Sequence, residues 1–213
     1  ESKIEVKKKD VKVTYNITLG KRLPIKDIEI SLPEDGTFGE DFLADTSAML
    51  VNIGDYLSED ILEKESARAA AAMKNLGYYE FSKNNMSFEA DTLAYPGYAV
   101  LKMSINEYTR NETPDQARPI SRYFFNNVSI SYPQSLQIKD KLLKELNTIR
   151  PGEIYSTDVV SNTYSRLASL RMFSSVNVAM TPVDSNKIDC RINLSQSKLQ
   201  GFKVNLEASS NST

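Results

Sequence analysis

The stretch Pro151-Gly152-Glu153-Ile154-Tyr155-Ser156 repeats, in altered form, the earlier stretch Ile53-Gly54-Asp55-Tyr56-Leu57-Ser58. A helical segment follows each stretch, and these segments end at Leu170-Arg171-Met172-Phe173 and Leu76-Gly77-Tyr78-Tyr79 respectively. Both copies contain a glycine–acid pair, two apolar residues, a serine, a helix and a closing aromatic residue. Self-similarity of this kind indicates that one structural unit occurs twice in the chain.

The hydrophobic residues of the first copy change their period in a fixed order. Alternation over 28–32 predicts a strand, and three- and four-residue steps over 38–53 predict an amphipathic helix. A second helix is expected over 58–76. The alternating segments 86–90 and 99–105 then predict two strands joined by a turn.

The second copy repeats this order of periods. We expect a strand over 123–130, helices over 138–149 and 157–167, and strands over 176–180 and 188–194. The order strand, helix, helix, strand, strand occurs twice, which is typical of an α+β fold. Each unit is predicted to have a three-stranded mixed sheet covered on one face by two helices.

The residues between the helices have capping and turn roles. Ser58 and Thr157 are the expected N-caps of the second helix in each copy. Asp55 and Glu153 occupy matching positions in different units, so we interpret them as helix-turn residues rather than as an acid pair for catalysis.

These patterns divide the chain into five parts. Residues 1–20 are predicted to be the last strand of a preceding unit and a connection, because 11–19 alternate as a strand does. Residues 21–109 form one unit, 110–119 a polar linker and 120–199 a second unit. Residues 200–213 begin a strand without a partner, so we expect them to be frayed.

The repeated order, with its glycine–acid junction and a helix end of the type Leu-x-x-Phe, resembles the POTRA domain. The strongest likeness lies in 151–156, Arg166-Leu167 and 173–178, which are similar to the final POTRA domain of the BamA/TamA outer-membrane protein assembly family (surface antigen type). Residues 13–20 resemble the strand that connects one POTRA domain to the next. Residues 201–207 resemble the start of the β-barrel of that family.

The resemblance implies the periplasmic arm of an outer-membrane assembly or insertion protein in a Gram-negative bacterium. Its implied partners are unfolded outer-membrane proteins, accessory periplasmic or lipoprotein subunits, and its own C-terminal β-barrel. An exposed edge of a three-stranded sheet accepts an extended peptide through backbone hydrogen bonds. The candidate binding residues lie on the second strand of each unit: Met86, Ser87, Phe88, Glu89, Ala90, Ser175, Val176, Asn177, Val178 and Ala179.

Three alternatives accompany this hypothesis. A two-partner secretion transporter would use the same fold to capture one dedicated client, and a passive spacer would use it without binding. A small α+β enzyme domain is the alternative from another class. The chain has no histidine, however, and its one cysteine, Cys190, alternates with Ile188 and Ile192 and is expected to face the core. We therefore expect no enzyme activity.

Composition also limits the function. The formal net charge is −2, which gives no strong field to attract nucleic acid. No metal-binding spacing, such as an EF-hand loop or HExxH, and no glycine-rich phosphate loop is present, so no metal or cofactor is expected. No segment approaches the roughly 20 apolar residues that span a bilayer as a helix.

Overall fold

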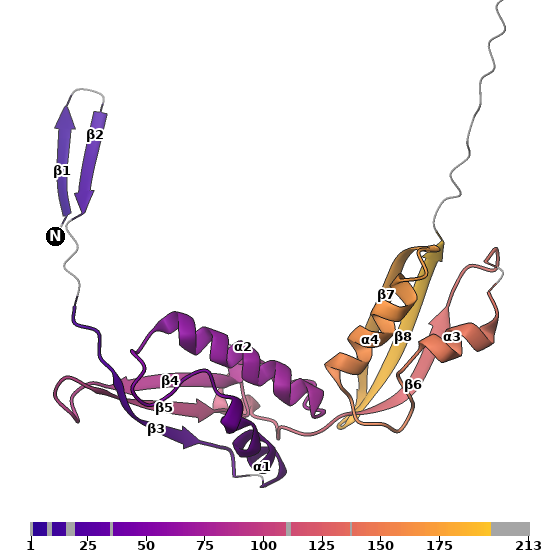
Figure 1. Cartoon of the computed structure of the whole chain (residues 1–213), viewed down its shortest axis with the longest axis horizontal. Helices are drawn as coiled ribbons and strands as arrows, with labels where there is room; N and C mark the ends of the chain where they lie inside the picture. The colour runs from indigo at the N-terminus through magenta and orange to yellow at the C-terminus, as the bar shows by residue number, and fades with distance from the viewer. Residues whose placement is uncertain are drawn as a thin grey trace, which may run out of the picture.

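The computed structural model contains two α+β units that follow each other along the chain (Figure 1). It describes residues 2–7, 10–15, 20–34, 36–109, 112–136 and 138–196. The first unit contains β3 (Ile25–Ser31), α1 (Gly36–Asp45), the 3-10 helix η1 (Thr46–Ala48), α2 (Glu59–Asn75), the 3-10 helix η2 (Lys83–Asn85), β4 (Met86–Asp91) and β5 (Ala99–Ile105). The second contains β6 (Phe124–Ser131), α3 (Asp140–Leu146), α4 (Thr157–Ala168), β7 (Phe173–Asp184) and β8 (Lys187–Gln196), and the 3-10 helix η3 (Pro114–Gln116) precedes it.

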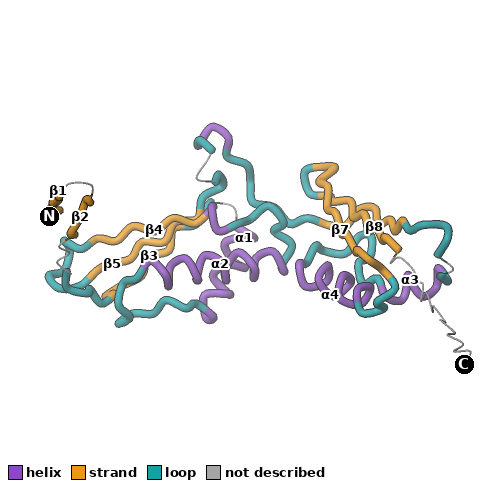
Figure 2. Tube along the Cα trace, turned by 90° about the horizontal axis from the view of Figure 1, so that it is seen from above, coloured by secondary structure: helices purple, strands orange, loops and turns teal. Residues whose placement is uncertain are grey.

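In each sheet the last strand of the unit is the central one. The strand orders are β3-β5-β4 and β6-β8-β7. The first strand runs parallel to the last, and the second runs antiparallel to it. Figure 2 shows α2 running alongside the first sheet and α4 alongside the second. The predicted fold class, two mixed three-stranded sheets with two helices each, is confirmed.

Alternation on the central strands places the core on one face of each sheet. On β5, Ala99, Leu101 and Met103 are fully buried, whereas Lys102 is exposed. Phe38 and Phe42 of α1 and Met73 of α2 are buried in one cluster with Met103, so both helices cover the same face. The central strand β8 follows the same pattern, with Ile188, Cys190, Ile192 and Leu194 all buried.

The glycine–acid junctions pair with the first strand of their own units. In the first unit the Ile25 N–H donates to the Asp55 carbonyl and the Gly54 N–H donates to the Ile25 carbonyl, both at 2.8 Å. Phe125 makes the equivalent bonds with Glu153 and Gly152, at 2.9 and 2.7 Å. Gly54 and Gly152 have φ values of 95° and 85°, which explains why glycine recurs at this turn.

The first helix of the first unit is shorter than the sequence predicts. The helix expected over 38–53 ends as α1 at Asp45, η1 follows, and Met49 has φ −56° and ψ 140°. The prediction was wrong because the chain leaves the helix after η1, and Val51, which is 2% exposed, enters the core from a non-helical segment. Leu50 and Ile53, which fit the helical spacing, are 43% and 65% exposed, so this spacing did not mark a buried helix face.

The second unit departs from prediction in the same way. The helix expected over 138–149 ends as α3 at Leu146, and Ile149 is buried beyond that end. The expected N-cap Thr157 is instead the first residue of α4, and Ser156 occupies the N-cap position with an extended backbone (φ −147°, ψ 131°).

An antiparallel hairpin of β1 (Ser2–Lys7) and β2 (Asp10–Tyr15) precedes the first unit. β2 coincides with most of the alternating segment 11–19, whereas β1 was not predicted. The prediction for 200–213 lies outside the described residues, and the unit boundaries drawn from the sequence stay predictions.

The loop after α2 joins the two units. Gly77 has φ 107°, and its carbonyl accepts a hydrogen bond from the Tyr123 N–H at 2.9 Å. A Cβ atom at Gly77 would lie 2.7 Å from Cγ2 of Ile154, in the second unit. The ring of Tyr79 packs against those of Tyr123 and Tyr155, with centroids 5.6 and 5.0 Å apart. The first unit therefore contributes an aromatic side chain to the second core.

Polar contacts cross the same junction. The Asn75 side-chain oxygen accepts hydrogen bonds from the Asp158 N–H at 2.9 Å and from the Ser156 hydroxyl at 3.2 Å. Asp41 of α1 pairs with Arg122 and accepts a hydrogen bond from the Tyr78 hydroxyl at 2.5 Å. Burial, followed by this bond to Asp41, raises the pKa of Tyr78 to about 12.

Candidate functional site

The second strand of the first unit, β4, lies at the edge of its sheet. It pairs with β5 on one side, and no other strand in the described part of the chain pairs with its outer side. The candidate residues divide by exposure. Met86 is buried, Ser87 and Phe88 are half-buried, and Glu89 and Ala90 are exposed.

The backbone of β4 has hydrogen-bonding groups on its free side. The Asn85 carbonyl accepts a hydrogen bond from the Asn106 N–H at 2.8 Å, so the backbone of Asn85 faces the β5 side. Successive residues of an antiparallel ladder direct their backbone groups to opposite sides. The N–H and C=O groups of Met86, Phe88 and Ala90 are therefore directed to the outer edge.

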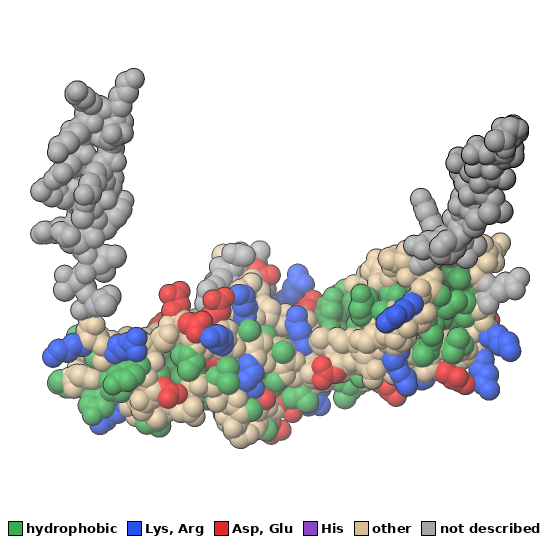
Figure 3. Space-filling view, turned by 45° about the horizontal axis from the view of Figure 1, so that its top comes forward, with side chains coloured by type: hydrophobic (Ala, Val, Ile, Leu, Met, Phe, Trp, Pro, Cys, Tyr) green, Lys and Arg blue, Asp and Glu red, His purple; other side chains and the backbone are tan. Residues whose placement is uncertain are grey.

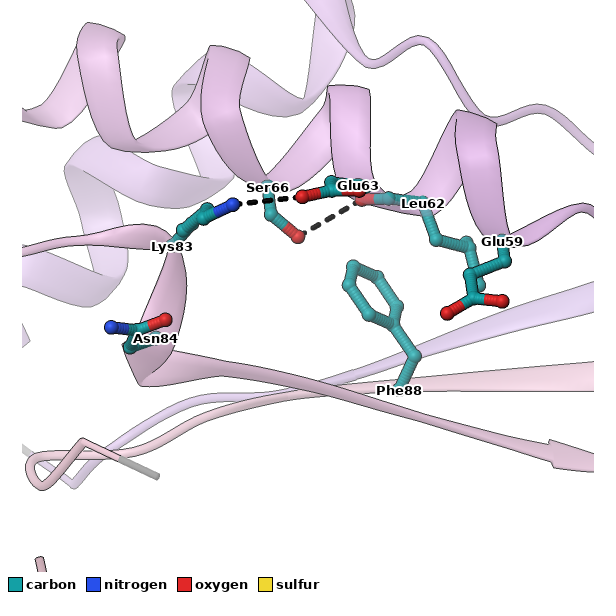
Figure 4. Close-up of a pocket in the computed structure, with 7 residues that line it drawn as sticks. All are labelled: Glu59, Leu62, Glu63, Ser66, Lys83, Asn84 and Phe88. Carbon is teal, nitrogen blue, oxygen red and sulfur yellow. Dashed lines mark hydrogen bonds and ion pairs between the residues drawn. The ribbon is translucent and has the colours of Figure 1, made fainter. Parts of the chain in front are cut away.

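A groove of about 320 Å³ lies between this edge and α2. Its lining residues come from α2, from η2 and from β4: Glu59, Leu62, Glu63, Ser66, Lys83, Asn84 and Phe88. Figure 4 shows the ring of Phe88 pointing from β4 into the space beneath α2. The hydroxyl of Ser66 donates to the Leu62 carbonyl at 2.9 Å, so its polar group is satisfied within the helix.

The charges of the groove are distributed unevenly. Lys83 of η2 pairs with Glu63 of α2 at 2.8 Å, and this ion pair bridges the helix and η2 on one side of Phe88 (Figure 4). Glu59 lies on the other side of Phe88, in the first turn of α2. Its carboxylate has no ion pair within the described ranges. The groove therefore has a neutralised end and an acidic end.

The second candidate edge, β7, is less regular. It lies at the outer side of the second sheet, where Ser175 and Asn177 are exposed and Val176, Val178 and Ala179 are half-buried. Its pairing with β8 shifts register near Ser174 and Val183, and Pro182 interrupts its backbone donors. Bulges and prolines of this kind protect an edge from further pairing, so β4 is the better candidate.

Sequence reasoning proposed the strand of the candidate site but not its opposite wall. Glu59, Leu62 and Lys83 lie outside the alternating segment that predicted β4. Acidic residues in the first turn of a helix are common because they suit the helix dipole, so Glu59 by itself marks no groove. That α2 lies opposite the edge of β4 with a space between them depends on tertiary packing, and no local pattern marks it.

Cys190 and the acidic side chains are the remaining candidates for catalysis or metal binding among the described residues. Cys190 is 1% exposed, and burial raises the pKa of its thiol to about 11, so the nucleophilic thiolate is disfavoured at neutral pH. Among the described residues, no group of three or more Cys, Asp or Glu side chains is placed to hold a metal ion.

No helix in the described part of the chain is long and apolar enough to cross a membrane. On the face shown in Figure 3, acidic and basic side chains are interspersed.

Solved structures with the same arrangement are known. The chain is similar to POTRA domains 3–5 of BamA from Haemophilus influenzae, with a TM-score of 0.54 and 13% identity over 92% of this chain and 71% of that one. It is also similar to BamA from Haemophilus ducreyi lacking POTRA domains 1–3, with a TM-score of 0.60 and 12% identity. This chain has a tandem POTRA fold.

The POTRA likeness is one of fold rather than of sequence. No protein-family model matches the sequence, and no curated protein matches it. The match covers 82% of this chain but 29% of the Haemophilus ducreyi BamA chain. The fold therefore agrees with the resemblance carried by the glycine–acid junctions, even though few residues are shared with either structure.

Proposed function

We propose that this chain is part of the periplasmic arm of an outer-membrane β-barrel assembly protein of the BamA type. In this proposal it binds extended segments of unfolded client proteins rather than catalysing a reaction. The observation that carries the proposal is the unpaired edge of β4 beside a groove beneath α2, in a chain with a tandem POTRA fold.

The geometry suits an extended client. Backbone groups at Met86, Phe88 and Ala90 offer hydrogen bonds that do not depend on client sequence. Side chains of an added strand alternate between two faces, so every second one would enter the groove against Phe88 and Leu62. Outer-membrane strands, which alternate apolar and polar residues, fit this arrangement.

The partners follow from the same proposal. The clients are unfolded outer-membrane proteins, and accessory periplasmic or lipoprotein subunits dock on the remaining surface. A C-terminal β-barrel of the same protein attaches the arm to the outer membrane. Residues 175–179 of β7 are a second, weaker site, because bulges and Pro182 flank them.

An NMR titration tests the binding site. Peptides from outer-membrane β-strands are expected to shift the amide signals of residues 86–90 at millimolar concentration, and scrambled peptides to shift them less. If no amide signal shifts at millimolar peptide concentration, peptide binding at this site is contradicted. The passive spacer is then the better hypothesis, because the contacts between the two units would hold them together. Capture of one client peptide only would favour a two-partner secretion arm.

The substitution Ala90→Pro tests whether the backbone edge itself binds. It removes an N–H that points away from β5, so the ladder with β5 should persist. Loss of one hydrogen bond should weaken peptide binding by roughly three- to tenfold. Gln134→Pro, in the exposed turn after β6, is the matched control and should bind as the unmodified chain does, because it also removes an N–H without a partner among the described residues but lies far from β4. Equal affinities of the two variants would contradict binding at this edge.

A further inference from the structure

The groove beneath α2 has a charge polarity that the edge-binding proposal alone does not use. Backbone pairing is indifferent to client sequence, but the side chains that enter the groove meet fixed charges. Glu63 and Lys83 neutralise each other at 2.8 Å on one side of Phe88. On the other side, the Glu59 carboxylate lies at the groove wall without an ionic partner among the residues that the structure describes.

We infer that the groove selects extended segments that carry an apolar side chain against Phe88 and Leu62 and a lysine or arginine beside Glu59. This inference rests on the proposed edge binding and names the class of segment bound. Side chains two residues apart lie on the same face of a strand, roughly 7 Å apart. The preferred pattern is therefore an apolar residue with a basic residue two positions away.

The positions of the charged residues along the groove explain why the preferred segment needs only one basic residue. β4 runs antiparallel to α2, since Met86 is buried with Met73 near the end of the helix, whereas Phe88 lines the groove with Leu62 and Glu59 near its start (Figure 4). Glu59 therefore lies toward the C-terminal end of β4. At the other end, the ion pair leaves no net charge for a second charged side chain to meet.

Peptides that are symmetric about a central phenylalanine test this without knowledge of strand direction. One peptide carries lysine two residues before and two residues after the phenylalanine, and the other carries glutamate at both positions. Whichever direction the peptide adopts, one of these side chains lies beside Glu59. An exposed charge pair contributes modestly, so the lysine peptide should bind about fivefold more tightly than the glutamate peptide at low salt.

The variant Glu59→Gln should reduce this ratio to about twofold or less, because only the net charge of the chain then distinguishes the peptides. Glu40→Gln is the matched control, since Glu40 is exposed on α1 and does not line the groove. Its ratio should stay near fivefold. High salt should reduce the ratio for the unmodified chain and for the control alike.

The outcomes separate this inference from the proposed function. A ratio that falls in Glu59→Gln alone supports it. Equal ratios in both variants, with amide shifts still centred on residues 86–90, would overturn the charge selectivity and leave edge binding intact. Failure of both peptides to shift these amides at millimolar concentration would overturn both.

Discussion

The second helices of the two units begin in the same way but are completed differently. Ser58 and Ser156 have nearly identical extended backbones, with φ −148° and −147°, and neither side chain caps its own helix. At the start of α4 the Asn75 side chain, from the other unit, accepts the Asp158 N–H at 2.9 Å. At the start of α2 no side-chain acceptor of this kind occurs among the described residues.

This difference shows that the second unit takes some of its stabilising contacts from the first. The N–H groups in the first turn of a helix need acceptors, and a capping side chain supplies one. α4 obtains its acceptor from Asn75, the last residue of α2, and the loop after α2 packs Tyr79 against Tyr123 and Tyr155 of the second unit. The junction is therefore part of the second unit rather than a flexible connection between two independent ones.

The largest expected effect comes from Gly77→Ala. The new Cβ would lie 2.7 Å from Ile154 Cγ2, and φ is 107°, so steric overlap and backbone strain add. We expect the free energy of unfolding to fall by about 3 kcal/mol. Gly54→Ala is the control, because its φ is 95° but nothing lies within 4 Å, and it should cost about 1 kcal/mol. Equal losses in urea denaturation would contradict tight contact between the units.

Tyr78 provides a pH-dependent test of the same junction. Its pKa is raised to about 12, first by burial and then by the hydrogen bond to Asp41. A raised folded-state pKa means that its contribution to stability is complete below about pH 10 and is lost as the pH rises to about 12. Between about pH 10 and pH 12, the free energy of unfolding of Tyr78→Phe should therefore fall by about 2 kcal/mol less than that of the unmodified chain.

The slope should not vanish in Tyr78→Phe, since burial also raises the pKa of Tyr123 to about 12. Denaturation series at several pH values measure both slopes. The same pH dependence in the variant and in the unmodified chain would exclude a stabilising neutral Tyr78 at the junction.

A smaller effect is expected from Asn75→Ala, which removes the cap from α4. The substitution should lower the free energy of unfolding by about 1 kcal/mol and increase hydrogen exchange in the first turn of α4. Ser58→Ala, at the N-cap position that makes no cap bond, should cost less than about 0.5 kcal/mol. If Ser58→Ala destabilised the chain as much as Asn75→Ala, the difference between the two helix starts would be unsupported.

The sequence predicted the features that are encoded locally. Alternation at 86–90 marked a strand that the structure has as Met86–Asp91, and alternation around Cys190 correctly predicted that this residue is buried. The extended segments that bury Val51 and Ile149 were misread as helical turns, because spacing alone does not separate the two.

The cap from Asn75 and the groove wall at Glu59 could not be predicted from local patterns. Both arise where segments distant in the sequence meet: Asn75 with Asp158, and Glu59 with Phe88. An asparagine near a helix end and a glutamate in a first turn have ordinary local explanations, and their further contacts depend on how the elements pack.

The central position of each closing strand also sets the order in which a unit is assembled. Within the sheet β3 and β4 are not bonded to each other, and β5, the last strand of the unit, is the one described strand with which each of them pairs. During synthesis, which proceeds from the N-terminus, neither strand has a sheet partner until residues 99–105 have been synthesised. The inner side of β4 is thus occupied at the moment the sheet forms, which leaves its outer side as the one open to another chain.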